Sequence, residues 1–474
     1  MTVRPFATVL SLLLPLLIWA SEAHGQAPTP SPAPATNSDA DSLPASTPPS
    51  SRSTGDLTRP AAVNVGLAPR SEQANAPDTP AEKPIRDLSR LLGLEDSRWQ
   101  LYGWIQNSYT ATPGFNPRNR STVTVFPNRL ANEWQGNQYY FIVERALGTE
   151  DEFDYGFRLD TLFGNDWMFT HSFGLFNNVF TPLGFVGVDF PQMYAELHLP
   201  VLFEGGIDLR GGRFYSPAGF ESVMAVNRPL LSVPYLLNYT PFTFLGALAR
   251  FHLSKHVVVS SGAVNGGDRW IDSNYHYGYL GGVNWTSESG KTTFTSTLFV
   301  GPNQLPFFPS ANLDLVDSYP VGVFTSPELQ NRRNPYYNRS TFVYSSNVLV
   351  RQWSDKLTQA AEVTVVTEGN VLGLGPRGRP IRGTYYGFCH HFLYQFHDKI
   401  TGVFRAEIFR DGNGLATGFD DTFNELTLGA IYKPRPNLWI RPEIRYDWAQ
   451  FTHPYDDGTR GGQLTLAFDV ILQF

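Results

Sequence analysis

The chain has 474 residues, of which 14% are aromatic and only 17% are charged, and it contains one cysteine, Cys389. Soluble domains usually carry about 25% charged residues, whereas the mean hydropathy of −0.23 is too low for a bundle of transmembrane helices. The single cysteine excludes an internal disulfide and a cysteine-based metal cluster, and the net charge of −7 argues against nucleic acid as a partner.

The first 25 residues have the parts of a secretory signal peptide. Arg4 precedes the apolar run "ATVLSLLLPLLIWA", and the small residues Ala23 and Gly25 follow it. The run is shorter than the ~20 residues that a membrane-spanning helix needs. We therefore predict that residues 1–25 are removed and that the mature protein leaves the cytoplasm.

A linker and a short helix are predicted next. Residues 26–84 consist largely of Pro, Ala, Ser and Thr, which bury too little apolar surface to offset the entropy of ordering the chain. We predict a disordered linker that acts as a spacer. In residues 85–97, four apolar side chains between Ile85 and Leu92 fall at helical spacing. They predict a short amphipathic periplasmic helix, which either lies on the rim of a channel or plugs it.

From residue 98 onward, apolar and polar residues alternate, as they do in strands with two different faces. In the segment 153–163 the odd positions are mostly aromatic or apolar, and the even positions include Asp154, Arg158 and Asp160. The last segment, 464–474, has Leu, Phe or Val at every second position and ends on Phe474. Each such strand therefore has one apolar face that could match lipid.

Counting these segments gives about 16: 99–110, 137–147, 153–163, 189–200, 205–215, 243–253, 256–265, 277–287, 291–301, 340–352, 357–367, 381–395, 400–410, 422–432, 437–448 and 462–474. The connections alternate between long and short, as in barrels with long external loops and tight periplasmic turns. Because every backbone group in a bilayer must be paired, such strands must close on themselves. For residues 98–474 the sequence predicts an all-β fold, a transmembrane antiparallel β-barrel of about 16 strands. We expect it in a bacterial outer membrane with both termini in the periplasm.

Several blocks of the first half resemble the OmpL-like β-barrel porins of bacteria. They include "LYGWIQNSYT", "DYGFRLDTLFGNDWMFT" and "GIDLRGGRFYSPAGFES", and they stand in the expected order between about residues 95 and 255. The resemblance implies an outer-membrane location and a porin architecture. The final Phe474 resembles the signature by which the barrel-assembly machinery recognises such proteins, so this machinery and outer-membrane lipid are expected partners.

A barrel of about 16 strands encloses a water-filled lumen, so the sequence predicts a porin for passive diffusion of ions and small hydrophilic solutes. Charged side chains that line a wet pore bias which ions pass. Because both signs occur on the same strands, we do not expect strong selectivity; for each residue the alternative is ion pairing that only stiffens the wall. The candidates for the pore lining and its constriction are Arg158, Asp160, Glu196, Asp208, Arg210, Arg213, Glu221, Arg228, Arg250, Arg405, Glu407, Arg441, Glu443 and Arg445.

The connection 216–241 is the predicted constriction. It is long, apolar and aromatic, unlike a loop exposed to water, and it joins the fifth and sixth strands. General porins, which this chain resembles, carry their inward-folded loop at that place. We expect Glu221 and Arg228 to face the wall residues Arg210, Arg213 and Arg250 across the narrowest point. The alternative is an outward loop that packs on a neighbouring subunit.

No catalytic residue, cofactor or metal is predicted. His198, His252 and His391 have no local motif that links them to a nucleophile, and neighbours in the run Cys389–His391 point to opposite faces of a strand. The main alternative function is a surface-binding module, in which a barrel with a plugged or narrow lumen anchors aromatic, Asn- and Arg-rich loops. A homotrimer is among the assemblies that the porin resemblance allows.

Overall fold

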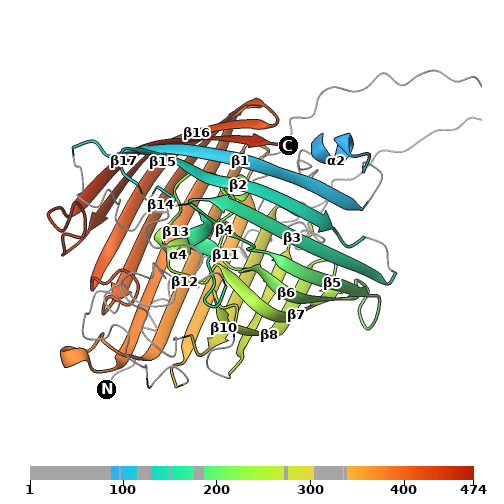
Figure 1. The fold of residues 1–474 in the computed structure, drawn as a ribbon, viewed down its shortest axis with the longest axis horizontal. Helices are drawn as coiled ribbons and strands as arrows, with labels where there is room; N and C mark the ends of the chain where they lie inside the picture. The colour runs from blue at the N-terminus through green and yellow to red at the C-terminus, as the bar shows by residue number, and fades with distance from the viewer. Residues whose placement is uncertain are drawn as a thin grey trace, which may run out of the picture. The chain divides into compact units, whose positions relative to one another are not determined.

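The computed structural model describes residues 87–94, 98–114, 127–128, 130–148, 152–175, 186–271, 276–303, 335 and 339–474. The predicted signal peptide and the linker lie outside these residues, so both stay predictions. The described part of the chain consists mainly of strands that close on themselves as a barrel (Figure 1).

The strands of the described residues form a single antiparallel sheet. They are β1 (Trp99–Ala111), β2 (Glu133–Arg145), β3 (Asp154–Gly164), β4 (Gly187–Asp189), β5 (Met193–Leu199), β6 (Ile207–Tyr215), β7 (Thr243–Ser254), β8 (Val257–Gly267), β9 (Gly278–Thr286), β10 (Thr292–Gly301), β11 (Phe342–Gln352), β12 (Leu357–Val371), β13 (Ile381–His397), β14 (Ile400–Gly412), β15 (Asp421–Arg435), β16 (Leu438–Ala449) and β17 (Gly462–Gln473). Each strand pairs with the next along the chain, and β17 pairs with β1, which closes the barrel. Because β4 and β5 both pair with β3, they form one interrupted strand, and the predicted barrel of 16 strands is confirmed.

The interruption lies where the sequence predicts one strand over residues 189–200. Pro191 falls between β4 and β5, and a proline has no N–H to donate to a strand ladder. The carbonyl of Gln192 already accepts a hydrogen bond from the Asp160 N–H at 2.8 Å, so pairing with β3 resumes directly after the proline.

The helices of the described residues are short: α2 (Asp87–Leu91), α3 (Trp167–Thr170), α4 (Tyr235–Asn238) and the 3-10 turns η1 (Ala225–Asn227) and η2 (Pro376–Gly378). In this part of the chain no helix is long and apolar enough to cross a bilayer. α2 is shorter than the helix predicted over residues 85–97. The Ser89 hydroxyl donates to the Leu101 carbonyl at 2.8 Å and accepts from the Leu101 N–H at 2.7 Å, which attaches α2 to the edge of β1.

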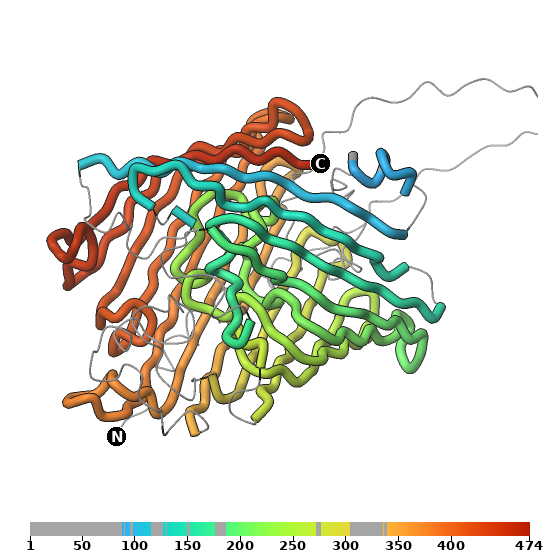
Figure 2. The backbone as a smooth tube through the Cα atoms, viewed as in Figure 1, coloured from blue at the N-terminus to red at the C-terminus, as the bar shows by residue number. Residues whose placement is uncertain are grey.

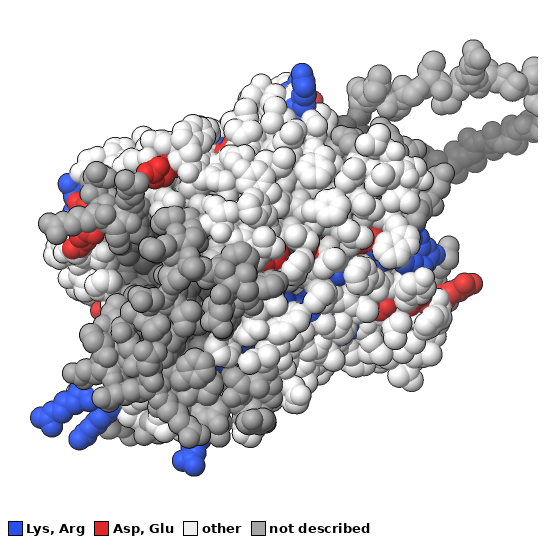
Figure 3. All heavy atoms as spheres, viewed as in Figure 1, with Lys and Arg blue, Asp and Glu red and all other residues white. Residues whose placement is uncertain are grey.

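Side chains alternate between the inside and the outside of the barrel wall. In β14, Arg405 and Phe409 are fully buried and face inward, while Phe404 and Ile408 are 39% and 49% exposed on the outside. In Figure 3, most of the coloured surface is white, and Lys, Arg, Asp and Glu show at the two ends and in a narrow strip across the middle. The wall therefore presents an apolar band to its surroundings, as a membrane barrel requires.

The barrel closes at the C-terminal residue. The backbone N–H and carbonyl of Phe474 pair with the carbonyl and N–H of Gly103 in β1, both at 3.0 Å. The Phe474 ring lies beside the Gly103 backbone, because a β-carbon built on Gly103 would stand 3.0 Å from the ring and only 2.1 Å from the Tyr140 carbonyl oxygen. The glycine thus lets three strands meet closely at the seam.

A methyl group at this seam is expected to impair closure. In the Gly103→Ala variant the β1–β2 pairing must shift, because the new β-carbon would collide with the backbone of Tyr140. We expect a lower yield of folded barrel, measured as the fraction whose gel mobility changes on heating. Gly211→Ala is the matched control, since nothing lies within 4 Å of a β-carbon there. Equal yields for the two variants would contradict this account of the seam.

Candidate pore constriction

Residues 216–241, between β6 and β7, lie inside the barrel; we call them the inner segment. Figure 2 shows this part of the chain, in green, crossing the interior. Its apolar side chains Leu230, Leu231, Tyr235 and Leu236 are completely buried, and Tyr235 and Leu236 belong to α4. An apolar connection hides from water most effectively inside the barrel, which agrees with the inward path expected from the sequence.

Two rows of charge run side by side along the inner wall of β12–β16. Strand pairing aligns Glu362, Cys389, Glu407, Glu425 and Asp447 in one row, which we call the acidic row. The next row toward the short-turn end of the barrel contains His391, Arg405, Thr427 and Arg445, and we call it the basic row. Every charged member of both rows is buried.

Wall carboxylates bind the backbone N–H groups of the inner segment. Glu407 accepts hydrogen bonds from the N–H groups of Tyr235 and Leu236, at 2.6 and 2.8 Å. In the same way Glu443 accepts from Leu231 and Ser232, at 2.9 and 3.1 Å. Glu362 of the acidic row accepts a further hydrogen bond, from the Phe220 N–H at 2.9 Å. The N–H groups of an irregular segment, which have no strand partner, are thereby satisfied.

Wall guanidinium groups bind the carbonyl groups of the same segment. Arg405 donates to the Ser232 carbonyl at 2.7 Å, and Arg445 donates to the Val233 carbonyl at 2.7 Å. Arg441 donates to the Arg228 carbonyl at 2.6 Å. Charges of both signs on the wall therefore hold one stretch of peptide backbone.

The inner segment also contacts the wall on the β2–β3 side. The Gln138 amide donates to the Val223 carbonyl at 2.8 Å and accepts from the Ala225 N–H at 3.0 Å. The guanidinium of Arg228 approaches the Asp166 carboxylate at 3.6 Å. The segment is thus held between β2–β3 and β12–β16.

Glu221 is the acidic side chain of the inner segment that binds the wall. Its Oε1 accepts hydrogen bonds from His391 Nε2 at 2.7 Å and from Arg405 Nη1 at 2.9 Å. Burial acts to raise the pKa of Glu221, but the charge of Arg405 and the hydrogen bond from His391 outweigh it and lower the pKa to about 2. The carboxylate therefore stays ionised throughout the neutral and mildly acidic range.

This depressed pKa predicts how the Glu221 contact depends on pH. The folded barrel favours the ionised carboxylate, so the contact stabilises fully above the ordinary pKa of 4.5 and is lost as the pH falls through about 2. We expect Glu221→Gln to lower the unfolding temperature by the same amount at pH 7 and pH 5. The difference from the unmodified chain should shrink near pH 2. A difference that vanished already at pH 5 would contradict the assignment.

The predicted partners of Glu221 and Arg228 need correction. They do not face Arg210, Arg213 and Arg250, because those three arginines bind carboxylates of their own wall. Arg210 bonds Glu196 at 2.8 Å, Arg250 bonds Asp208 at 3.0 Å, and Arg213 bonds Asp189 at 2.8 Å. Glu221 instead binds His391 of β13 and Arg405 of β14, and Arg228 approaches the Asp166 carboxylate.

Every predicted lining residue on the wall points inward, whereas Glu221 and Arg228 lie on the inner segment. None of the set is more than 6% exposed. Six wall residues of this set bind the inner segment directly: Arg158, Arg405, Glu407, Arg441, Glu443 and Arg445. Arg158 and Asp160 pair with each other at 2.7 Å on β3. Their role as a pore lining stays a prediction. Gln138 of β2 and Asp166, which follows β3, also face inward and are buried, but the sequence pattern did not predict their contact with the inner segment.

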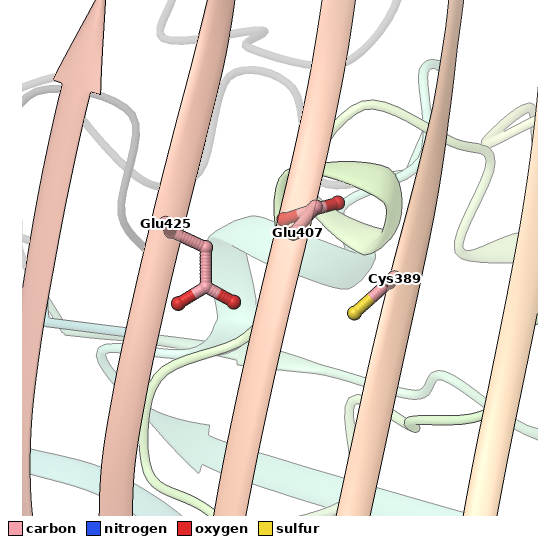
Figure 4. Close-up of side chains that lie close together, drawn as sticks. All are labelled: Cys389, Glu407 and Glu425. Atoms are coloured by element: carbon pink, nitrogen blue, oxygen red, sulfur yellow. The ribbon is translucent and has the colours of Figure 1, made fainter.

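One group of potential metal ligands lies in the acidic row. The ligand atoms of Cys389, Glu407 and Glu425 lie within 4.8 Å of one another, on three neighbouring strands (Figure 4). Both carboxylates already have partners: Glu407 binds backbone N–H groups, and Glu425 accepts from Arg405 at 2.6 Å. The group is thus part of the binding surface for the inner segment. Likewise, His198 and His252 both bind the same carboxylate, Asp208, at 2.7 and 2.8 Å.

The comparison with known proteins gives a family and a fold. The model of the family described as "Putative beta-barrel porin-2, OmpL-like" matches residues 99–474. The high-pH structure of Pseudomonas putida OprB has a TM-score of 0.52 and 11% identity, covering 81% of this chain and 96% of OprB. The outer membrane channel DcaP of Acinetobacter baumannii has a TM-score of 0.50 and 9% identity, covering 79% of this chain and 97% of DcaP. The search of curated proteins returned no match.

Proposed function

The chain belongs to the family of OmpL-like putative β-barrel porins, and we propose that it is an outer-membrane channel for passive diffusion of ions and small hydrophilic solutes, narrowed by the inner segment. The observation that supports this proposal is that buried wall charges of both signs bind the backbone of the inner segment within the lumen. A 16-stranded barrel is wide enough to hold water, so a segment fixed within it sets the width of any path.

Most arginines along the proposed path are paired with carboxylates, although buried carboxylates outnumber buried arginines among the described residues. Arginines and carboxylates alternate in paired rows, and the wall away from the inner segment is bridged by pairs such as Arg210 with Glu196. Opposite charges at close range cancel much of each other's field beyond a few ångströms. We therefore expect weak selectivity between cations and anions, and we assign no catalytic activity.

The proposal includes an orientation. β1 begins and β17 ends at the barrel end that carries the short turns, so we place both termini and the linker 26–84 in the periplasm. The strand ending at Phe474 would be offered to the barrel-assembly machinery, and the apolar outer face would contact lipid.

One observation favours the alternative function, a surface-binding module with a plugged or narrow lumen. The charged residues that the sequence predicts as a pore lining are nearly inaccessible to water, at 6% exposure or less. If the inner segment never yields a continuous path, the barrel would serve as an anchor for its external loops.

Conductance of the refolded chain in a planar bilayer under a salt gradient separates the two functions. A channel gives current steps of stable size with a reversal potential near zero, because most wall arginines are paired with carboxylates and their fields largely cancel. A silent bilayer, with folding verified by gel mobility that changes on heating, would contradict the channel and favour the surface-binding module.

A further inference from the structure

Polar side chains gather on the outside of the barrel at mid-height, where lipid-facing residues are normally apolar. Ser296 lies near the middle of β10, and Asn347 lies at the centre of β11. The Ser296 hydroxyl donates to the Asn347 side-chain oxygen at 2.8 Å, and the Asn347 amide donates to the Ser345 hydroxyl at 3.3 Å. We call these three residues the outer polar cluster.

The alternation of burial places this cluster on the outer face. Ser345 and Asn347 alternate along β11 with the buried Tyr344 and Ser346, and Leu349, on the same side as Asn347, is 40% exposed. The cluster therefore faces the same surroundings as the apolar band, not the lumen. Strand pairing aligns Ser296 with Val283 on one side and Asn347 with Val363 on the other, so apolar residues flank it.

A second polar pair extends the cluster toward the short-turn end of the neighbouring strands. On the outer faces of β12 and β13, the Gln359 amide lies 2.6 Å from His390 Nε2. The Trp353 ring N–H donates to the Gln359 side-chain oxygen at 2.6 Å. Polar outer residues thus extend from β10 to β13.

One outer row of small residues lies on β5–β8, which β9 separates from the cluster. Across β5–β8, strand pairing aligns Ala195, Gly211, Ala247 and Ala263 in one row. The matching outer positions of β13–β17 carry bulky residues, among them Phe388, Phe404, Leu428, Ile444 and Leu466. The outer face of β13–β17 is therefore bulky, whereas one row across β5–β8 is small and ends at the exposed Tyr279 of β9.

Hydrocarbon cannot satisfy the polar groups of this cluster. A side-chain amide has two N–H groups and an oxygen that accepts two hydrogen bonds, and among the described residues Asn347 has one donor and one acceptor partner within its own barrel. Only a protein within the membrane can offer further partners at this depth. A second copy of the same surface supplies both kinds, because the cluster contains amide donors as well as hydroxyl and amide acceptors.

We propose that the outer face of β10–β13, centred on Asn347, is the interface through which copies of this chain associate in the membrane. The proposal rests on the proposed function only in requiring that the strands cross a bilayer. The small residues over β5–β8 would lie at the margin of this interface, and the bulky faces of β13–β17 would remain toward lipid. Each barrel would keep its own lumen.

Association is tested with Asn347→Trp, whose bulk fits lipid but not a close interface. Asn107→Trp is the matched control. Asn107 lies on the outer face of β1, and its side-chain oxygen already accepts a hydrogen bond from the Tyr139 hydroxyl at 2.9 Å. The mass of the full-length chains, extracted in mild detergent, is measured by light scattering after gel filtration. We expect several copies for the unmodified chain and for Asn107→Trp, and a single copy for Asn347→Trp.

Three results would overturn the interface: a single copy for the unmodified chain, unchanged association of Asn347→Trp, or equal dissociation of Asn107→Trp. If gel mobility shows that Asn347→Trp does not fold, the smaller substitution Asn347→Leu is used in its place. Asn347→Leu is expected to abolish association, and association retained in this variant would overturn the interface. Conductance is recorded in parallel, and a step size per barrel unchanged by Asn347→Trp is expected. If the association test fails, the conductance result can still be interpreted. If no conductance is found, the association result can still be interpreted.

Discussion

Deletion of residues 222–232 is expected to raise the single-channel conductance several-fold. The deletion removes the middle of the inner segment, which includes Leu230, Leu231 and the backbone groups that Glu443 binds. The lumen of the 16-stranded barrel would then be limited by the wall and no longer by the segment. The measurement is step size in a planar bilayer, compared between the full chain and the deletion.

The control for this deletion is removal of residues 376–379 from the turn between β12 and β13, because the backbone hydrogen bonds of these residues stay within that turn. Its conductance should equal that of the full chain. If deletion of residues 222–232 left the step size unchanged while the barrel folded normally, the inner segment would not be the constriction.

The second large effect is expected from Arg405→Met. This substitution removes the hydrogen bonds from Arg405 to Glu221, Glu425 and both the carbonyl and hydroxyl of Ser232. Breaking a buried ion pair from one side leaves an uncompensated charge and costs about 3–5 kcal/mol. We expect a lower unfolding temperature together with frequent current steps above the normal level, as the inner segment leaves the wall.

Arg250→Met provides a matched comparison. Arg250 is also buried, but it binds the wall carboxylates Glu196 and Asp208. Its loss should lower the unfolding temperature without adding larger current steps. If both variants gave the same current records, the wall charges would stabilise the barrel without positioning the inner segment.

Much of the barrel could be predicted because its signal is local. Alternation along a strand reflects which face meets lipid, and it placed residues such as Arg405 and Glu407 on the inner wall without knowledge of any contact. The interrupted strand at Pro191 was missed because the alternation continues on both sides of the proline, even though the ladder cannot. The helix around Ser89 was predicted too long, because α2 ends at Leu91 and residues 92–94 are not helical.

The partners inside the lumen could not be predicted in the same way. The inner segment has no repeating pattern, so the sequence does not tell which wall Glu221 reaches. Its main contacts are backbone groups bound by wall charges, as with Tyr235 and Glu407, and backbone groups are the same at every residue. A pattern of inward Arg and Glu therefore looks alike whether it lines water or holds a peptide.

The central claim is that the barrel contains a water-filled path that the inner segment keeps narrow. It is tested most directly by the swelling of vesicles that contain the refolded chain, in a series of uncharged sugars of increasing size. The account predicts rapid entry of the smallest sugars and a steep fall in rate as the sugars grow larger. Vesicles with folded barrels that admitted no sugar, or that admitted large and small sugars equally, would contradict it.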